Sequence, residues 1–382
     1  MLSLGLDSAL LETQDGTWTA REIAQQPEML RATHRLLRDQ ADALRNFLAP
    51  FASDPSARII LTGAGTSSFI GDCLAPYLAH RMPGRVEATP TTDIVGAPDR
   101  CLRPGPPTLL VSFGRSGNSP ESIAALDLAS ELVPGVRHLI VTCNRDGALA
   151  HAARPDDQLI VLPDDAHDRG FAMTSSFTCM TYAALAAFSG VERLDGRIDG
   201  IARSVAAAIE LAVPLAAELA AAQFERVAYL GSHVFKGLAR EAALKLMELT
   251  DGQIVALSES PLGFRHGPKT MITPRTLVIL FVSNDALTRR YDLDLLEELR
   301  RDGRAQRVVA VTAQGGTTAD ALRIPEMADV DDIDLLFSYI VAPQIFALHA
   351  SLAHGLAPDN PNVAGIVNRV VQGVAIHRSV AA

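Results

Sequence analysis

The stretch Thr108-Leu109-Leu110-Val111-Ser112-Phe113-Gly114-Arg115-Ser116-Gly117-Asn118-Ser119 joins an apolar run to a loop of glycine and hydroxyl residues. The run is almost continuously apolar, which is typical of a strand buried on both faces of a parallel sheet. A helical pattern follows the loop, from Glu121 to Val133. A strand, a loop and a helix in this order predict one βαβ unit of an α/β fold.

Seven further short apolar runs alternate with helical patterns along the chain. They cover residues 58–62, 138–142, 159–163, 226–230, 276–280, 308–312 and 321–325. The two halves are spaced alike: 226 minus 58 and 276 minus 108 give 168, 312 minus 142 gives 170, and 325 minus 163 gives 162. The spacing indicates a duplicated domain, although α/β proteins also repeat strand spacings by chance. We therefore expect two tandem α/β domains, each a parallel sheet flanked by helices.

The length of 382 residues also exceeds what one hydrophobic core usually supports. We expect an N-terminal extension at residues 1–30, packed on the first domain, and domains at residues 31–195 and 200–350. A C-terminal tail covers residues 351–382. Within the first domain, a stripe of apolar residues predicts one helix over residues 33–51.

The formal charge of −10 argues against a general nucleic-acid or membrane-surface binder, since either needs a basic face. The first residues lack a basic region followed by a long apolar run, so we expect no secretory signal and a cytoplasmic protein. Charged residues and a proline interrupt the apolar stretch 204–222, which predicts a soluble helix. The cysteines lie far apart, which predicts free thiols at Cys73, Cys101, Cys143 and Cys179.

Two glycine and hydroxyl loops follow neighbouring strands of the first half, at residues 63–68 and 112–119. Such loops offer backbone N–H groups, hydroxyl donors and a helix N-terminus, which together bind a phosphate without net positive charge. Either loop alone also suits an ordinary turn or helix cap. The second half lacks these features, having Gly231-Ser232-His233 and Val282-Ser283-Asn284-Asp285 instead. A further hydroxyl cluster, Met173-Thr174-Ser175-Ser176, either lines the same pocket or caps the next helix.

Acid–base groups are concentrated in the second half. Glu241, Lys245 and Glu248 share one face of a predicted helix over residues 236–249, an arrangement that ordinary solvated helices also show. The following segment, residues 258–269, is predicted to be a long loop that carries His266. Histidine exchanges protons readily at neutral pH, and a loop can carry it into the pocket of another subunit. The alternative is a turn histidine without chemistry.

Six motifs resemble those of the SIS-domain (sugar isomerase) enzymes, and within them the tagatose-6-phosphate ketose/aldose isomerase family, whose members include D-galactosamine-6-phosphate deaminases. The motifs extend over nearly the whole chain: Gly16-Thr17-Trp18-Thr19, Leu61-Thr62-Gly63-Ala64-Gly65-Thr66-Ser67, Ser112-Phe113-Gly114-Arg115-Ser116-Gly117-Asn118-Ser119-Pro120-Glu121-Ser122, His167-Asp168-Arg169-Gly170-Phe171-Ala172-Met173-Thr174-Ser175-Ser176, Gly263-Phe264-Arg265-His266-Gly267-Pro268-Lys269 and Val367-Asn368-Arg369-Val370-Val371-Gln372-Gly373-Val374.

This resemblance implies an aldose–ketose conversion like that of the isomerase half of glucosamine-6-phosphate synthase, with no metal or cofactor. Glu248 would move a proton between C2 and C1, Lys245 would tune that carboxylate, and His266 would assist ring opening from the partner subunit of a homodimer or larger oligomer. The phosphate would be held by Gly65, Thr66, Ser67, Arg115, Ser116 and Ser119. Other expected pocket residues are Ser112, Gly114, Thr174, Ser175, Arg369 and Gln372.

For an amino sugar, this isomerisation gives an imine at C2 that water hydrolyses to ammonia and a ketose phosphate. The synthase carries a glutaminase domain that supplies ammonia; none is recognised here, so we expect deamination, with galactosamine 6-phosphate favoured. The synthase also uses a lysine in its C-terminal tail, which Arg369 or Gln372 would have to replace here. The alternatives are an ammonia-free isomerase, a deglycase and a non-catalytic sugar-phosphate sensor.

Overall fold

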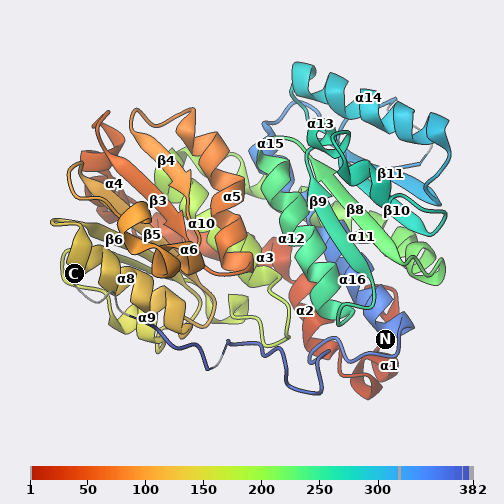
Figure 1. Ribbon diagram of the computed structural model, residues 1–382, viewed down its shortest axis with the longest axis horizontal. Coiled ribbons are helices and arrows are strands. Elements are labelled where there is room, and N and C mark those ends of the chain that lie inside the picture. The colour runs from red at the N-terminus through yellow and green to blue at the C-terminus, as the bar shows by residue number, and fades with distance from the viewer. Residues whose placement is uncertain (1, 317–319, 372, 378–382) are drawn as a thin grey trace. The chain divides into compact units, whose positions relative to one another are not determined.

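The computed structural model describes residues 2–316, 320–371 and 373–377, which contain two five-stranded parallel sheets (Figure 1). The first sheet has the order β4 (Arg85–Ala88), β3 (Arg58–Thr62), β5 (Thr108–Gly114), β6 (Arg137–Thr142) and β7 (Gln158–Val161). The second has the order β9 (Val255–Glu259), β8 (Arg226–Gly231), β10 (Thr276–Phe281), β11 (Arg307–Thr312) and β12 (Ala321–Arg323). The same order of corresponding strands in both sheets confirms the predicted fold of two tandem α/β domains.

Helices alternate with the strands in both halves. Those up to residue 189 are α1 (Ser8–Thr13), α2 (Thr17–Ala24), α3 (Gln26–Arg38), α4 (Ala41–Ala52), α5 (Thr66–Ala79), α6 (Thr91–Gly96), α7 (Pro98–Cys101), α8 (Pro120–Leu132), α9 (Ala148–His151) and α10 (Ser175–Ser189). The later ones are α11 (Ile198–Ala221), α12 (Val234–Leu249), α13 (Pro261–Phe264), α14 (Ala286–Asp302), α15 (Asp332–Tyr339) and α16 (Val341–Ala353). The N-terminus adds a small antiparallel pair, β1 (Leu2–Ser3) and β2 (Leu6–Asp7).

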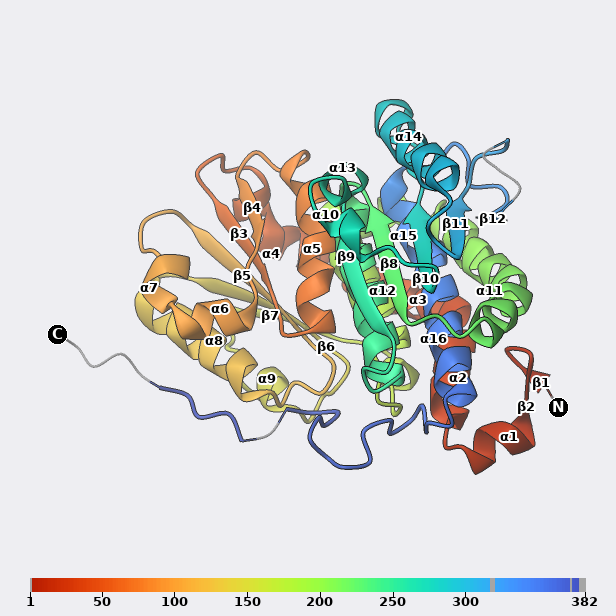
Figure 2. The same ribbon diagram turned by 45° about the vertical axis from the view of Figure 1, so that its right-hand side comes forward.

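Each sheet has helices on both faces, because its central strands are apolar on both sides. In the first sheet, α6 and α8 cover the face of Ile60 and Leu110, and α5 packs on the opposite face, where Gly71 lies against Leu61. In the second sheet, α13 and α14 cover the face of Leu280. Helices α11 and α16 pack on the other face, against Ile279 (Figure 2).

The chain divides into two compact units that are interlaced in sequence. The second-sheet unit comprises Met1–Arg31, Asp168–Thr178 and Asp195–Val363; the first-sheet unit comprises Ala32–His167, Cys179–Leu194 and Ala364–Ala382. Residues 1–31 thus group with the second sheet, whereas the sequence suggested an extension packed on the first domain. Contacts within the second-sheet unit explain this grouping, since Gln26 donates to Gln344 of α16 and the His349 ring bonds to the Leu4 carbonyl.

All eight predicted strands are present, and besides the N-terminal pair the structure adds one strand to each sheet, β4 and β9. Both are edge strands with partly exposed residues, so their apolar pattern is weak. The single helix predicted over residues 33–51 is two helices, α3 and α4. The predicted loop 258–269 contains the end of β9, the short helix α13 and the start of a 3₁₀ turn at Pro268–Met271. The four cysteines are free thiols, as predicted.

Two helical stretches, Ile198–Ala221 and Asp332–Ala353, are long and apolar enough to cross a membrane by length and composition alone. The apolar window of the second is 94% buried, as in the core helix of a folded domain. In the first, buried residues such as Ala212, Ala216 and Leu219 recur at helical spacing and face α16. Packing on the second sheet therefore accounts for both stretches.

Helix α11 offers a matched pair of leucines for testing this packing. Leu219 is 2% exposed and Leu211 is 42% exposed. We expect Leu219→Ala to lower the free energy of unfolding by about 2–5 kcal/mol, because it leaves a cavity against the sheet. The control Leu211→Ala should change it by about 0.5 kcal/mol or less. Urea unfolding followed by circular dichroism measures both, and equal losses would contradict this packing.

Candidate active site

The two glycine and hydroxyl loops of the first half lie at one edge of the first sheet. Strands β3 and β5 run parallel with Thr62 opposite Ser112, so both strands end on the same side. Gly114 at the end of β5 is in turn opposite Thr142 of β6. The carboxyl edge of a parallel sheet is where α/β proteins bind ligands.

The helices that follow these loops begin without a side-chain cap. Helix α5 follows Gly65, whose φ of 56° and ψ of −129° favour glycine, and helix α8 follows Ser119. Gly65 has no side chain to cap α5, and the Ser119 side chain does not bond to a backbone N–H in the first turn of α8. The hydroxyl of Ser119 instead contacts that of Ser122 at 2.6 Å. Two uncapped N-termini at one sheet edge give a favourable environment for an anion.

Hydroxyl groups line the same edge. Thr66 and Ser112 are buried, and their hydroxyl oxygens have no hydrogen-bond partner among the described residues. Buried polar groups are normally bonded, so such hydroxyls are suited to a ligand. Glycine at position 63 is required by close packing, because a Cβ there would lie 2.6 Å from the backbone carbon of Ser67.

The loop after β5 is held by residues that the sequence analysis did not identify. The side-chain amide of Asn144 donates to the Ser116 carbonyl at 2.8 Å, and the backbone N–H of Leu149 donates to the Gly117 carbonyl at 2.8 Å. The side chain of Asn118 accepts from the N–H of Ala148 at 2.9 Å. Asn144 could have been predicted from the sequence, because it lies shortly after β6 and therefore at the same sheet edge.

Arg115 is brought together with the C-terminal tail. Its side chain is buried, and its guanidinium donates to the backbone carbonyl of Arg369 at 2.8 Å. The predicted pocket residue Arg369 therefore contacts the loop through its backbone. Gln372, the other tail residue predicted for the pocket, lies outside the described residues.

Thr174 and Ser175 lie in the second-sheet unit and are buried. The Asp168 carboxylate accepts from the backbone N–H of Thr174 at 2.7 Å and that of Ser175 at 3.1 Å. The Ser175 hydroxyl donates to the Glu22 carbonyl at 2.6 Å. These contacts favour the alternative in which the hydroxyl cluster belongs to the start of the next helix, α10.

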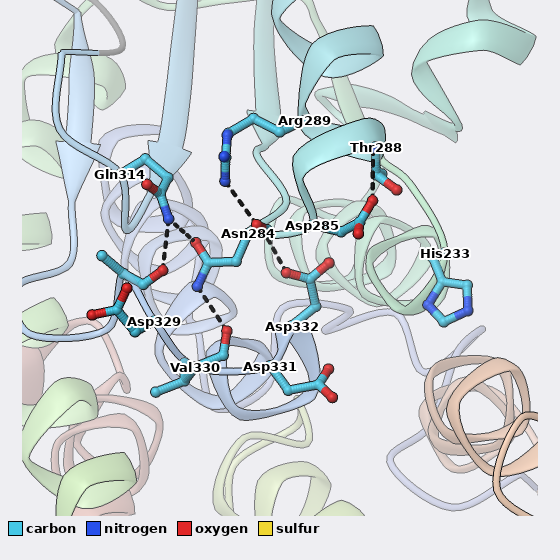
Figure 3. Close-up of a pocket in the computed structure, with 11 residues that line it drawn as sticks. His233, Asn284, Asp285, Thr288, Arg289, Gln314, Asp329, Val330, Asp331 and Asp332 are labelled. Carbon is cyan, nitrogen blue, oxygen red and sulfur yellow. Dashed lines mark hydrogen bonds between the residues drawn. The ribbon is translucent and has the colours of Figure 1, made fainter.

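The carboxyl edge of the second sheet borders a cavity of about 690 Å³ (Figure 3). Of the helices that begin there, α14 and α15 have side-chain caps, whereas α12 begins after His233 without one. Asp285 accepts from the backbone N–H groups of Leu287 and Thr288, and Asp331 caps α15. The amide of Gln314 donates to the side chain of Asn284 at 2.8 Å. At the starts of α14 and α15, carboxylates of the chain thus occupy the positions that an anion would take.

The predicted charged face of α12 is buried or partly buried, contrary to the solvated-face alternative. Glu241 and Lys245 have side chains that are 0% and 1% exposed, and the Glu248 side chain is 23% exposed. The Lys245 ammonium lies 3.6 Å from the Glu241 carboxylate and forms an ion pair with that of Glu248. The helix therefore holds a buried cation beside a carboxylate that solvent reaches, as a proton-transfer group requires.

His266 lies in the same unit on an exposed position, just before Gly267, whose φ is 121°. No hydrogen bond or ion pair within the described part of the chain joins its ring to Glu248. The structure thus brings Lys245 and Glu248 together in the second-sheet unit and the loop residues from Gly65 to Ser119 together in the first-sheet unit.

Known proteins resemble this chain over most of its length. The SIS domain family model matches residues 54–190, which include the whole first sheet. It is 46% identical over 369 residues to the D-galactosamine-6-phosphate deaminase AgaS of Escherichia coli, covering 95% of this chain and 96% of the relative. The corresponding enzyme of Shewanella sp. (strain ANA-3) is 43% identical over 371 residues, covering 96% and 93%.

A crystal structure of tagatose-6-phosphate ketose/aldose isomerase from Escherichia coli superposes with a TM-score of 0.88 and 42% sequence identity. The superposition covers 96% of this chain and 98% of the chain in the crystal structure. The chain therefore belongs to the family of D-galactosamine-6-phosphate deaminases (AgaS) and tagatose-6-phosphate ketose/aldose isomerases.

A buried acid in the second-sheet unit, Glu22, predicts how the stability of the protein changes with pH. Glu22 accepts from the backbone N–H of Arg169 and Gly170, yet burial and the nearby Asp168 raise the pKa of Glu22 to about 8. The folded state then binds more protons than the unfolded state, whose Glu has a pKa of about 4.3. The free energy of unfolding should consequently fall as the pH rises between these two pKa values.

Glu22→Gln, which is neutral at every pH, should make that fall shallower, and the exposed Glu12→Gln should leave it unchanged. Urea unfolding of the three proteins across this pH range measures the effect. A decline as steep in Glu22→Gln as in the unmodified protein would contradict the raised pKa.

Proposed function

We propose that the chain converts an amino-sugar 6-phosphate, with galactosamine 6-phosphate favoured, to tagatose 6-phosphate and ammonia. The observation that carries the proposal is the ion pair of the buried Lys245 with the partly buried Glu248, in a chain whose first sheet ends in uncapped, hydroxyl-rich loops. Relatives 43–46% identical over most of their length have this deaminase activity in their names. A sugar-phosphate sensor would not need a buried acid–base pair, so the proposal favours catalysis.

The phosphate is held by the loop residues of the first-sheet unit. The hydroxyls of Ser67, Ser116 and Ser119, the Arg115 guanidinium and the backbone N–H groups at the start of α5 and α8 are the donors in this proposal. Charge-assisted hydrogen bonds of this kind are stronger than neutral ones, so they suffice in an acidic chain. Ser112 and Thr66 contribute the buried hydroxyls that lack partners among the described residues.

Proton transfer is assigned to Glu248. Once His266 has assisted ring opening, the Glu248 carboxylate removes the proton from C2 of the open-chain amino aldose. The electron pair of that C–H bond forms the C1–C2 double bond of an enolamine, and the carbonyl oxygen at C1 takes a proton. Glu248 then returns its proton to C1, which leaves an iminium at C2. The iminium nitrogen loses one proton to water, which balances the proton that the C1 oxygen took from water, and an imine remains at C2. Lys245 offsets the negative charge of Glu248 in its partly buried surroundings.

Water completes the reaction. It adds to the C2 imine, and the resulting carbinolamine expels ammonia to give the ketose 6-phosphate. One water is consumed and one ammonia is released for each amino sugar. A hydroxyl sugar in the same site would stop at isomerisation, which is the second candidate function because the solved relative at 42% identity is a tagatose-6-phosphate ketose/aldose isomerase.

The assembly and location belong to the same proposal. We infer a cytoplasmic homodimer or larger homo-oligomer in which His266 enters the site of the neighbouring subunit. The exposed position of His266 and the absence of a described bond to Glu248 within the chain support this inference. The overall net charge of −10 supports a small-molecule substrate and not a nucleic acid.

Incubation with galactosamine 6-phosphate tests the activity directly. We expect equal amounts of ammonia and tagatose 6-phosphate, measured by a coupled ammonia assay and by chromatography. Glucosamine 6-phosphate serves as the epimer control and should react more slowly. If no ammonia forms from either amino sugar while tagatose 6-phosphate is isomerised to an aldose, the second candidate replaces the first; no turnover of any of these overturns both.

The roles of the two units are separable by substitution. Glu248→Gln should lower kcat by about 100- to 10,000-fold, because it removes the proton-transfer group, and should retain sugar-phosphate binding. The exposed Glu210→Gln is its matched control. Steady-state kinetics and isothermal titration measure the two effects. Full activity of Glu248→Gln would show that another residue is the base.

Ser116→Ala combined with Ser119→Ala should act mainly on KM. Loss of two hydrogen bonds to a charged phosphate should raise KM by about a hundredfold or more. Ser53→Ala, which alters an exposed serine on the same unit, should leave KM unchanged. An unchanged KM in the double variant would remove this loop from phosphate binding.

A further inference from the structure

The residues on both sides of His266 are held by the same helix, α14. The Arg265 guanidinium donates to the Glu298 carboxylate at 2.8 Å. The Lys269 ammonium forms ion pairs with Glu298 and with Asp302, the latter at 2.5 Å. One carboxylate on α14 thus bridges two cations that lie on either side of the histidine in sequence.

The segment around His266 is also anchored by a buried aromatic side chain. Phe264 is fully buried in the core of the second-sheet unit, together with Leu295 and Leu299 of α14. The side chains of Arg265, Lys269 and Glu298 are 28%, 25% and 23% exposed, so their ion pairs are partly shielded from water. These contacts hold the pKa of the Glu298 carboxyl below its usual value, chiefly through the hydrogen bond from Lys269.

His266 itself is held only through its backbone. Its N–H donates to the Gly263 carbonyl at 3.0 Å, and within the described residues its ring has no hydrogen-bond or ion-pair partner. The next residue, Gly267, has a φ of 121°, a conformation that side chains rarely adopt. The direction of the imidazole is therefore set by the residues that fix the chain before and after it.

We propose that Glu298, supported by Asp302, is a positioning residue for His266. The inference rests on the proposed function, in which His266 assists ring opening. A catalytic group has to stay within about 0.5 Å of its productive position, and an exposed loop does not provide this by itself. Glu298 provides it by clamping both flanking cations to α14. An isolated exposed pair, such as Glu225 with Arg275, has no such effect.

The test is a double-mutant cycle on the full-length protein with galactosamine 6-phosphate. Glu298→Gln should lower kcat by about ten- to a hundredfold with little change in KM, because the imidazole is displaced and the phosphate loop is untouched. In the His266→Ala background, Glu298→Gln should have no further effect on kcat. Glu225→Gln, which removes the isolated exposed pair, is the matched control and should behave as the unmodified protein.

The outcomes distinguish a failure of the role proposed for His266 from a failure of the role proposed for Glu298. Full activity of His266→Ala would overturn the role proposed for His266, and the inference with it. An impaired His266→Ala combined with a fully active Glu298→Gln, or with additive losses in the double variant, would overturn the inference alone. Should Glu298→Gln fail to fold, as judged by circular dichroism, Asp302→Asn replaces it, with a smaller fall in kcat expected and the same non-additivity required.

Discussion

Parallel pairing in register is the constraint on which the candidate site depends. Because Thr62 lies opposite Ser112 and Gly114 lies opposite Thr142, three consecutive strands end at one edge and deliver their loops to the same place. Residues fifty positions apart in sequence thereby become neighbours. The second sheet obeys the same constraint, since Gly231 lies opposite Phe281. What differs between the two edges is the chemistry of the residues that come next.

The caps of the following helices account for this difference. The side chain of Ser119 precedes α8 without bonding to a backbone N–H of its first turn, whereas that of Asp285 precedes α14 and accepts from two N–H groups. A carboxylate on the chain occupies the place that a phosphate would take. The N-cap of α5 is Gly65, and that of α12 is His233, which lies 233 minus 65, or 168, residues later. The two residues have nearly the same backbone conformation, with φ of 56° and 54°. The two domains thus share backbone geometry and differ in what their loops can bind.

Much of this organisation could be predicted from the sequence. Continuous apolar runs identified eight strands, including the edge strands β7 and β12, each of which keeps one buried residue. Strands β4 and β9 escaped because none of their residues is fully buried, so their apolar pattern is weak. The spacing of Glu241, Lys245 and Glu248 placed them on one helix face. It could not show whether water or protein covers that face, because the packing of α12 against its neighbours in the folded unit decides it. For the same reason, the partner of Thr174 and Ser175 became apparent only when the fold placed Asp168 beside their backbone.

The interlacing of the two units has a consequence for how the protein is made. Helix α3 and helix α10 each cross from one unit into the other, and residues 1–31 complete a unit whose remaining core lies mainly at residues 195–363. Residues 2–31 therefore reach their final surroundings only after most of the chain has been synthesised. Cutting the chain between the two sheets would leave neither half with a complete unit, because each unit draws segments from both sides of the cut.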